Sequence, residues 1–315
     1  MAALLVSAGA CGVVWAAYTG TVTSSGDQLV AATDWVAPSA SAAVIGKSQG
    51  GVPGYIHQGG AYNLYAAVED SGAPASGVST VTANANAITT GQTAATLSSG
   101  SFTLGSSTYG YRTASLTANA TLAAGTYEFS LTSKDAAGNG RTQGGYTVVV
   151  DDTAPSASDV QTTNKSGGTV GRPELGDSIT FTFSEPIDPS SILAGWTGAA
   201  TNVVVRINNG SGGQNDVLLV YNATNATQLP LGSVNLGRTE YVTANATFGA
   251  TGTASTMVEN GEAITVTLGT ASSGTSTALI GGTMIWTPSA SAYDRAGNAE
   301  TTTTRSESGT SDRDF

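Results

Sequence analysis

The stretch SKDAAGNGRTQGGYTVVVDDTAPSASDV, residues 133–160, decides the fold. Apolar and polar residues alternate just before it, over 127–131, and again inside it, over 146–150. A period of two is typical of a strand with one buried face. The turn DAAGNG joins the two strands, and Pro155 ends the second because proline cannot donate to a sheet ladder. The stretch therefore predicts a β-hairpin.

Two pieces of this stretch recur in the chain. DAAGN (135–139) returns as DRAGN (294–298), and TAPSASD (153–159) is anticipated by VAPSASA (36–42). Each unit thus opens with A-P-S and finishes near D-x-A-G-N. The stretch is then the last hairpin of one β-sandwich, a linker of two aspartates, and the first strand of a second β-sandwich. The sequence predicts an all-β fold with two tandem sandwiches.

The second unit repeats the alternation, with larger insertions. Residues 179, 181 and 183 are apolar in DSITFTFSEPID, and VLLVY (217–221) is interpreted as a continuous buried run. Turn signals every ~8–12 residues favour sandwiches, and no sustained helical periodicity follows Ala17. The predicted division of the chain is an apolar, signal-like segment with a leading strand at 1–37, sandwiches at 38–150 and 151–302, and a polar tail at 303–315.

The composition excludes several classes of function. Only 10% of the 315 residues are charged, and the net charge of −11 comes with 11 scattered basic residues. A nucleic-acid-binding surface needs clustered Lys and Arg, so no nucleic-acid partner is expected. The single cysteine, Cys11, excludes an intrachain disulfide and a cysteine-rich metal site.

The first residues, MAALLVSAGACGVVWAA (1–17), form an apolar run. The run is shorter than the ~20 residues of a membrane helix and close to the hydrophobic region of a signal peptide, although a basic segment before it is missing. We therefore expect an extracellular or cell-surface location and no stable membrane span.

Several motifs resemble known families. YEFSLTSKDAAGN, followed by YTVVVDDTAP, and VEDSGAPASGVSTV resemble the bacterial Ig-like repeats of large extracellular adhesins. GDSITFTFSEPIDPSSI (176–192) looks like a strand of the Ig-like domain of S-layer and surface proteins, and AAYTGTVTSSGDQLVAATDWVAPS is similar to the start of camelysin/TasA-type secreted proteins. The resemblance implies two Ig-like sandwiches in a secreted surface protein.

Acidic residues in turns are the candidate metal ligands. Asp70, Asp135, Asp151 and Asp152 lie in turn or junction contexts, where aspartate commonly bonds its own backbone. Calcium takes six to eight oxygen ligands, many from carboxylates and carbonyls. We hypothesise that these residues, with Glu69 beside Asp70, converge on an interdomain Ca²⁺ that stiffens the linker. Ordinary turn aspartates are the alternative.

The sequence contains no recognisable catalytic motif. His57 is the one histidine, in the loop GYIHQGG, and a catalytic triad needs its base oriented by a neighbour. We expect no enzymatic activity and no catalytic or cofactor-binding residue. The expected function is a subunit of an extracellular filament or surface layer, which self-associates through strand contacts. The alternative is a monomeric adhesin or carbohydrate-binding module, for which Trp196 and Tyr55 are the candidate aromatics and cell-wall or surface glycans the partners.

Overall fold

The computed structural model describes residues 23–24, 27–28, 34–48, 51–311 and 313–315. The signal-like segment at 1–17 and Cys11 lie outside the described residues. Strands dominate the described chain, and its one helix is the four-residue α1 (Pro189–Ile192). The prediction of an all-β fold is confirmed, with two large sheets in sandwich-like arrangements.

The first large sheet lies in the N-terminal half, here residues 34–150. Its strands follow the order β3-β5-β8-β7-β6-β10-β11-β4, and β9 pairs with β5. Their bounds are β3 (Ser39–Lys47), β4 (Tyr55–Ile56), β5 (Ala61–Glu69), β6 (Val78–Asn84), β7 (Ala95–Leu104), β8 (Ser107–Thr113), β9 (Leu116–Thr117), β10 (Gly125–Asp135) and β11 (Gly140–Val150). A separate two-stranded hairpin precedes them, formed by β1 (Thr23–Ser24) and β2 (Asp27–Gln28).

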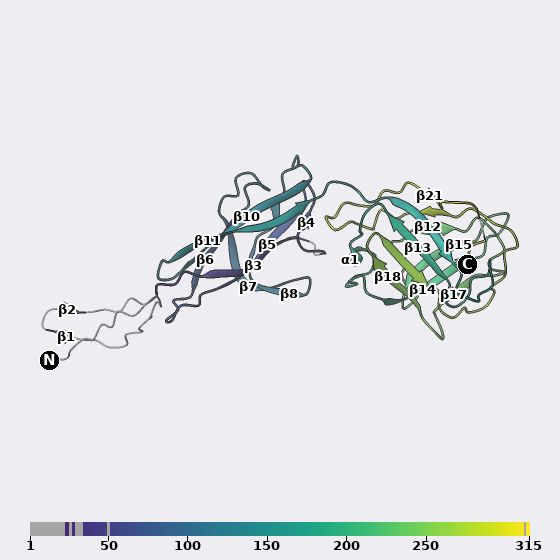
Figure 1. The fold of residues 1–315 in the computed structure, drawn as a ribbon, viewed down its shortest axis with the longest axis horizontal. Coiled ribbons are helices and arrows are strands. Elements are labelled where there is room, and N and C mark those ends of the chain that lie inside the picture. Colours follow the sequence, from purple (N-terminus) through teal and green to yellow (C-terminus); the bar gives the residue numbers. More distant parts are fainter. Residues whose placement is uncertain (1–22, 25–26, 29–33, 49–50, 312) are drawn as a thin grey trace.

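The second large sheet lies in the C-terminal half, residues 151–315. Its order is β12-β13-β19-β18-β14-β15-β16-β20-β21, and β17 pairs with β14. The bounds are β12 (Ala157–Thr163), β13 (Ser178–Phe183), β14 (Thr201–Asn208), β15 (Val217–Asn222), β16 (Ser233–Asn235), β17 (Ala246–Phe248), β18 (Ser255–Asn260), β19 (Ala263–Thr267), β20 (Ile285–Thr287) and β21 (Arg305–Ser306). Figure 1 shows the two sheets as two bodies joined end to end.

The predicted hairpin at 126–150 is present as β10 and β11. The two strands pair antiparallel from Gly125↔Val150 to Lys134↔Gly140, around the DAAGN turn. Phe129 and Leu131 are buried, as the alternation requires, although a bulge shifts the register between them. Short-range alternation thus located the strand and its buried face.

Each half has its own hydrophobic cluster. The cluster of the N-terminal half lies between Ile45 and Val150, whereas that of the C-terminal half lies between Val160 and Phe315. Trp286 is fully buried in the second, with its ring 5.2 Å from that of Phe181 and 5.0 Å from that of Phe183. The domain boundaries stay a prediction, because separate clusters do not test whether either half folds alone.

Side chains help to close the first sheet on itself. The amide of Gln143 on β11 accepts from Ala40 N at 2.6 Å and donates to Ala40 O at 3.1 Å. Ala40 lies at a register shift in β3, where the ladder to β5 is irregular. The side-chain amide therefore satisfies backbone groups that the bulge leaves without strand partners.

Two predictions about individual segments need correction. VLLVY is not a continuous buried run, because only Leu218 and Val220 are buried. The other three residues are half-buried: Val217, Leu219 and Tyr221. The Arg206 guanidinium covers the ring of Tyr221 at 3.7 Å, so β15 has one core face and one partly covered outer face. The polar tail at 303–315 also contributes to the core: Phe315 is 1% exposed and meets the Tyr241 ring edge to face at 5.8 Å.

Candidate functional site

The D-x-A-G-N motif builds the same turn in the later part of each half. Asp135 and Asp294 are buried, and each accepts a hydrogen bond from the backbone of the motif's asparagine, at 2.7 Å and 2.8 Å. The glycine before that asparagine has φ of +95° in Gly138 and +99° in Gly297, a region that glycine occupies without a steric penalty. The repeated letters therefore encode a repeated backbone conformation.

The asparagine of each turn also holds the first segment of its own half. Asn139 Nδ2 donates to the Asp34 carbonyl at 3.1 Å, and Asn298 Nδ2 donates to the Asp151 carbonyl at 2.8 Å. Asp34 and Asp151 each lie four residues before the proline of an A-P-S run. The D-x-A-G-N turn of each half is thus fixed against the first residues of that half, which brings distant aspartates together.

Two equivalent carboxylate triads result. Asp34, Asp70 and Asp135 form the first triad, and Asp151, Glu185 and Asp294 form the second. Within each triad, one oxygen from each residue lies within 4.8 Å of the others. The third member follows the strand that pairs with the first edge strand of each large sheet, since Asp70 follows β5, which pairs with β3, and Glu185 follows β13, which pairs with β12.

Hydrogen bonds already stabilise the first triad. Asp34 accepts from Val36 N at 3.0 Å and from both the backbone and the hydroxyl of Ser76 at 2.8 Å. These bonds, first that from Val36, lower the pKa of Asp34 to about 2. Asp70 accepts from Gly77 N at 2.7 Å. The protein's own donors therefore stabilise the ionised form of Asp34.

The second triad is less well satisfied. Burial, together with the negative charges of Asp151 and Asp294, raises the pKa of Glu185 to about 7. Glu185 Oε1 is buried and has no hydrogen-bond partner in the described part of the chain. Glu185 therefore binds a proton near neutral pH, where three adjacent charges would otherwise repel one another.

The predicted calcium ligands do not gather in one place. Asp70 and Asp135 belong to the first triad and Asp151 to the second, while the Asp152 carboxylate accepts from Gln58 N at 2.8 Å. The hypothesis of a single interdomain site is thereby replaced by two candidate sites, one in each half. Each triad offers three carboxylates in the oxygen-rich surroundings that calcium prefers.

Sequence reasoning missed Asp34, Glu185 and Asp294. The internal repeats carried the signal for two of them. Aligning the A-P-S runs places Asp34 opposite Asp151, and aligning the D-x-A-G-N motifs places Asp294 opposite Asp135. Glu185 follows only from the register of β12 against β13, which a single sequence does not provide.

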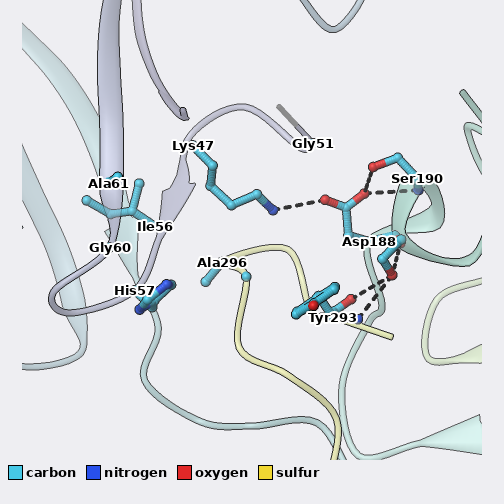
Figure 2. Close-up of a pocket in the computed structure, with 12 residues that line it drawn as sticks. Lys47, Gly51, Ile56, His57, Gly60, Ala61, Asp188, Ser190, Tyr293 and Ala296 are labelled. Carbon is cyan, nitrogen blue, oxygen red and sulfur yellow. Dashed lines mark hydrogen bonds and ion pairs between the residues drawn. The ribbon is translucent and has the colours of Figure 1, made fainter. Parts of the chain in front are cut away.

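A cavity of about 310 Å³ lies between the two halves (Figure 2). It is lined by residues of both halves: Lys47, Gly51, Ile56, His57, Gly60 and Ala61, and Asp188, Ser190, Ser191, Tyr293, Ala296 and Gly297. Its polar side chains largely bond one another. The Ser190 hydroxyl donates to Asp188 Oδ1 at 2.6 Å, and Lys47 Nζ donates to Asp188 Oδ2 at 2.9 Å.

His57 lines this cavity and does not form a catalytic triad with the described residues. Its Nδ1 lies 2.7 Å from the Gln58 carbonyl, and the nearby Ser190 hydroxyl bonds the carboxylate of Asp188. A hydroxyl nucleophile needs a base in hydrogen-bond reach that takes its proton readily. The base beside Ser190 is the Asp188 carboxylate, and its lowered pKa and its ion pair with Lys47 make it a weak proton acceptor. The expectation that the chain has no enzymatic activity stays a prediction.

The aromatic residues suggested for glycan binding are poorly exposed. Trp196 is 7% exposed and donates its Nε1 to the Ala199 carbonyl, and Tyr55 is half-buried on β4. Tyr293, which sequence reasoning did not select, is 42% exposed at the cavity. The exposed aromatic ring near the cavity between the two halves is therefore that of Tyr293, whereas the ring of Trp196 is buried.

No helix within the described ranges is long and apolar enough to span a membrane. Comparison with known proteins finds no family model that matches the chain and no curated protein that resembles it.

Proposed function

We propose that the chain is a non-enzymatic, secreted structural protein of the cell surface, and that it self-associates as a subunit of a filament or surface layer. The observation that supports this best is that one local arrangement occurs in both halves of the chain. In each half, the same turn is tethered by its asparagine and lies beside a carboxylate triad. Like units joined in series suit an extended structural element, in which each unit contacts its neighbours. Ig-like sandwiches and an extracellular location are parts of this proposal.

Contacts between subunits would come from sheet edges. β3 and β4 end the first sheet, and β12 and β21 end the second. The two end strands of each sheet also contact each other, so strand addition would use the stretches of edge backbone that these contacts leave open. Strand addition at such an edge supplies main-chain hydrogen bonds without needing a deep pocket. The net charge of −11 opposes close approach of subunits at low salt, so assembly should strengthen as salt screens that charge.

Calcium is the cation that the triads would hold. The second triad is the stronger candidate, since the buried Glu185 Oε1 lacks a partner among the described residues and Asp151 and Asp294 lie beside it. A divalent cation there would offset the repulsion among the three carboxylates and fix the residues that follow β11.

Electron microscopy of the purified full-length chain tests the structural role. Negative-stain images in calcium, in EDTA and at two salt concentrations should show regular fibres or sheets. Dispersed single particles under all four conditions would contradict the assembly proposal. A loss of order in EDTA alone would connect assembly to the triads.

The second candidate is a monomeric surface adhesin or carbohydrate-binding module. The exposed Tyr293 ring at the cavity favours it, because aromatic rings commonly stack on sugars. Saturable binding to cell-wall glycans that Tyr293→Ala abolishes and Trp35→Ala retains would support this candidate; Trp35 is a suitable control because it is 68% exposed and does not line the cavity. Equal binding by both variants would argue against it.

A further inference from the structure

We infer that the two halves are held in one fixed orientation by a junction built from the Lys47–Asp188 ion pair and a linker tethered on both sides. This inference concerns the single chain and is independent of the assembly proposed above. It rests on contacts between residues more than 100 positions apart, which join β3 and its following loop to the segments around α1 and the DRAGN turn.

The ion pair is shielded, and both of its charged groups make further hydrogen bonds. Lys47 Nζ lies 2.9 Å from Asp188 Oδ2, and the two side chains are 15% and 5% exposed. Lys47 also donates to the Arg295 carbonyl at 2.6 Å, while Asp188 accepts from Val52 N at 3.3 Å and from Ser190 N at 3.0 Å. Figure 2 shows the lysine reaching from one half to the carboxylate of the other.

Asp188 is ionised in this arrangement. Burial by itself would raise its pKa, but the Ser190 hydrogen bonds and the Lys47 ammonium outweigh that effect and hold the pKa below its usual value. Asp188 is also the N-cap of α1, so the carboxylate that receives Lys47 has its position fixed by local structure. The Lys47–Asp188 pair is therefore a charge-assisted hydrogen bond whose two groups are each held in position by further hydrogen bonds.

Two glycines make room for the pair. Gly51, in the N-terminal half, has φ of +99°, and a Cβ there would overlap Asp188 Oδ2 and lie 2.8 Å from Lys47 Nζ. Gly297, in the C-terminal half, also has φ of +99°, and a Cβ there would lie 3.1 Å from Lys47 Cδ. A side chain at Gly51 would thus displace the charged groups, whereas one at Gly297 would crowd the alkyl stem of Lys47, and both positions also have a φ that favours glycine.

The linker is bonded to both halves. Toward the N-terminal half, Asp151 N donates to the Ile56 carbonyl at 3.0 Å and Asp152 accepts from Gln58 N at 2.8 Å. Toward the C-terminal half, Asn298 Nδ2 donates to the Asp151 carbonyl at 2.8 Å and Thr301 N donates to the Pro155 carbonyl at 2.9 Å. A segment bonded in this way does not act as a free hinge.

The polar groups of the cavity argue for a structural junction and against a ligand pocket. Asp188 accepts hydrogen bonds on both oxygens, and the Ser191 hydroxyl donates to the Asp188 carbonyl at 2.7 Å. A ligand would have to replace bonds that the protein already makes, at a cost in affinity. These groups are arranged to join the halves.

Distance measurements between spin labels test the junction in the full-length chain. Cysteines replace the exposed strand residues Thr96 on β7 and Thr256 on β18, with Cys11 replaced by Ser. Pulsed electron paramagnetic resonance should give one narrow distribution of distances between the labels at positions 96 and 256. Lys47→Met keeps the alkyl stem and removes the charge, and it should broaden the distribution at least twofold. Lys134→Met, at an exposed lysine on β10, is the matched control and should leave the width unchanged.

Asp188→Asn provides a second, independent perturbation, which should broaden the distribution in the same way. Circular dichroism spectra that match the parent would show that each half keeps its fold. A broad distribution in the parent protein would overturn the inference. So would an unchanged width in both Lys47→Met and Asp188→Asn.

Discussion

Glu300 provides the sharpest test of the packing in the C-terminal half. The residue is 2% exposed, and neither carboxylate oxygen has a hydrogen-bond partner among the described residues. Burial raises the pKa of Glu300 to about 8, against a weaker opposing effect of the Ser289 backbone. The folded protein therefore keeps a proton on Glu300 at neutral pH, and the unfolded chain releases it.

The sign of the effect on stability follows from proton uptake. Below pH 4.5 the folded and the unfolded state both hold the proton on Glu300. In that range Glu300 does not make the free energy of unfolding depend on pH. Between pH 4.5 and pH 8 the folded state binds one proton more than the unfolded state, so the free energy of unfolding falls as pH rises. A pKa that rises from 4.5 to about 8 corresponds to a loss of roughly 3–4 kcal/mol between pH 5 and pH 8.

Glu300→Gln removes the titration and keeps the shape of the side chain. The amide introduces buried donors that cost about 1–3 kcal/mol at every pH, so the pH dependence is the informative quantity. We expect the free energy of unfolding of Glu300→Gln to fall less between pH 5 and pH 8 than that of the parent, by about 3 kcal/mol. Glu128→Gln, at an exposed glutamate on β10, should show the parent's dependence.

Urea denaturation at four pH values, followed by tryptophan fluorescence, measures these differences. Trp196 and Trp286 both belong to the hydrophobic cluster of the C-terminal half. With Trp15 and Trp35 replaced by Phe in every variant, the signal follows the half that contains Glu300. Parallel pH curves for Glu300→Gln and the parent, within about 1 kcal/mol, would refute the reasoning. They would mean that Glu300 ionises in the folded state without penalty.

Three further predictions concern the triads, the turns and the last residues. Calcium at about 100 times its dissociation constant should raise the free energy of unfolding by about 3 kcal/mol. Asp294→Asn should abolish that gain. An unchanged calorimetric midpoint in calcium would contradict the cation hypothesis. Asn298→Ala should lower the free energy of unfolding by about 1–3 kcal/mol, because it removes the hydrogen bonds to Asp294 and the Asp151 carbonyl. Asn139→Ala should have the same effect in the N-terminal half. Urea curves that match the parent would show that these turns do not hold the first segment of each half in place. Phe315→Ala should cost about 3–5 kcal/mol because it leaves a cavity beside Tyr241, whereas a loss below 1 kcal/mol in thermal unfolding would show that the core closes without it.

Local patterns in the sequence determined the strands and turns. The alternation at 127–131 and 146–150 predicted β10 and β11 with the correct faces, because successive side chains of a strand point to opposite sides wherever the strand ends up. The DAAGN and DRAGN turns were equally readable, since their aspartate, glycine and asparagine act within five residues. Fold class followed from such local signals.

Contacts between distant segments were decided by tertiary structure alone. The candidate sites needed Asp34 beside Asp135 and Glu185 beside Asp294, and those distances depend on sheet register and on the bulges in β3 and β12. The same holds for Lys47 and Asp188, 141 residues apart, whose meeting depends on how one half is placed against the other. Sequence spacing constrains neighbours along a strand, whereas the approach of separate strands is set by packing, which no single segment encodes.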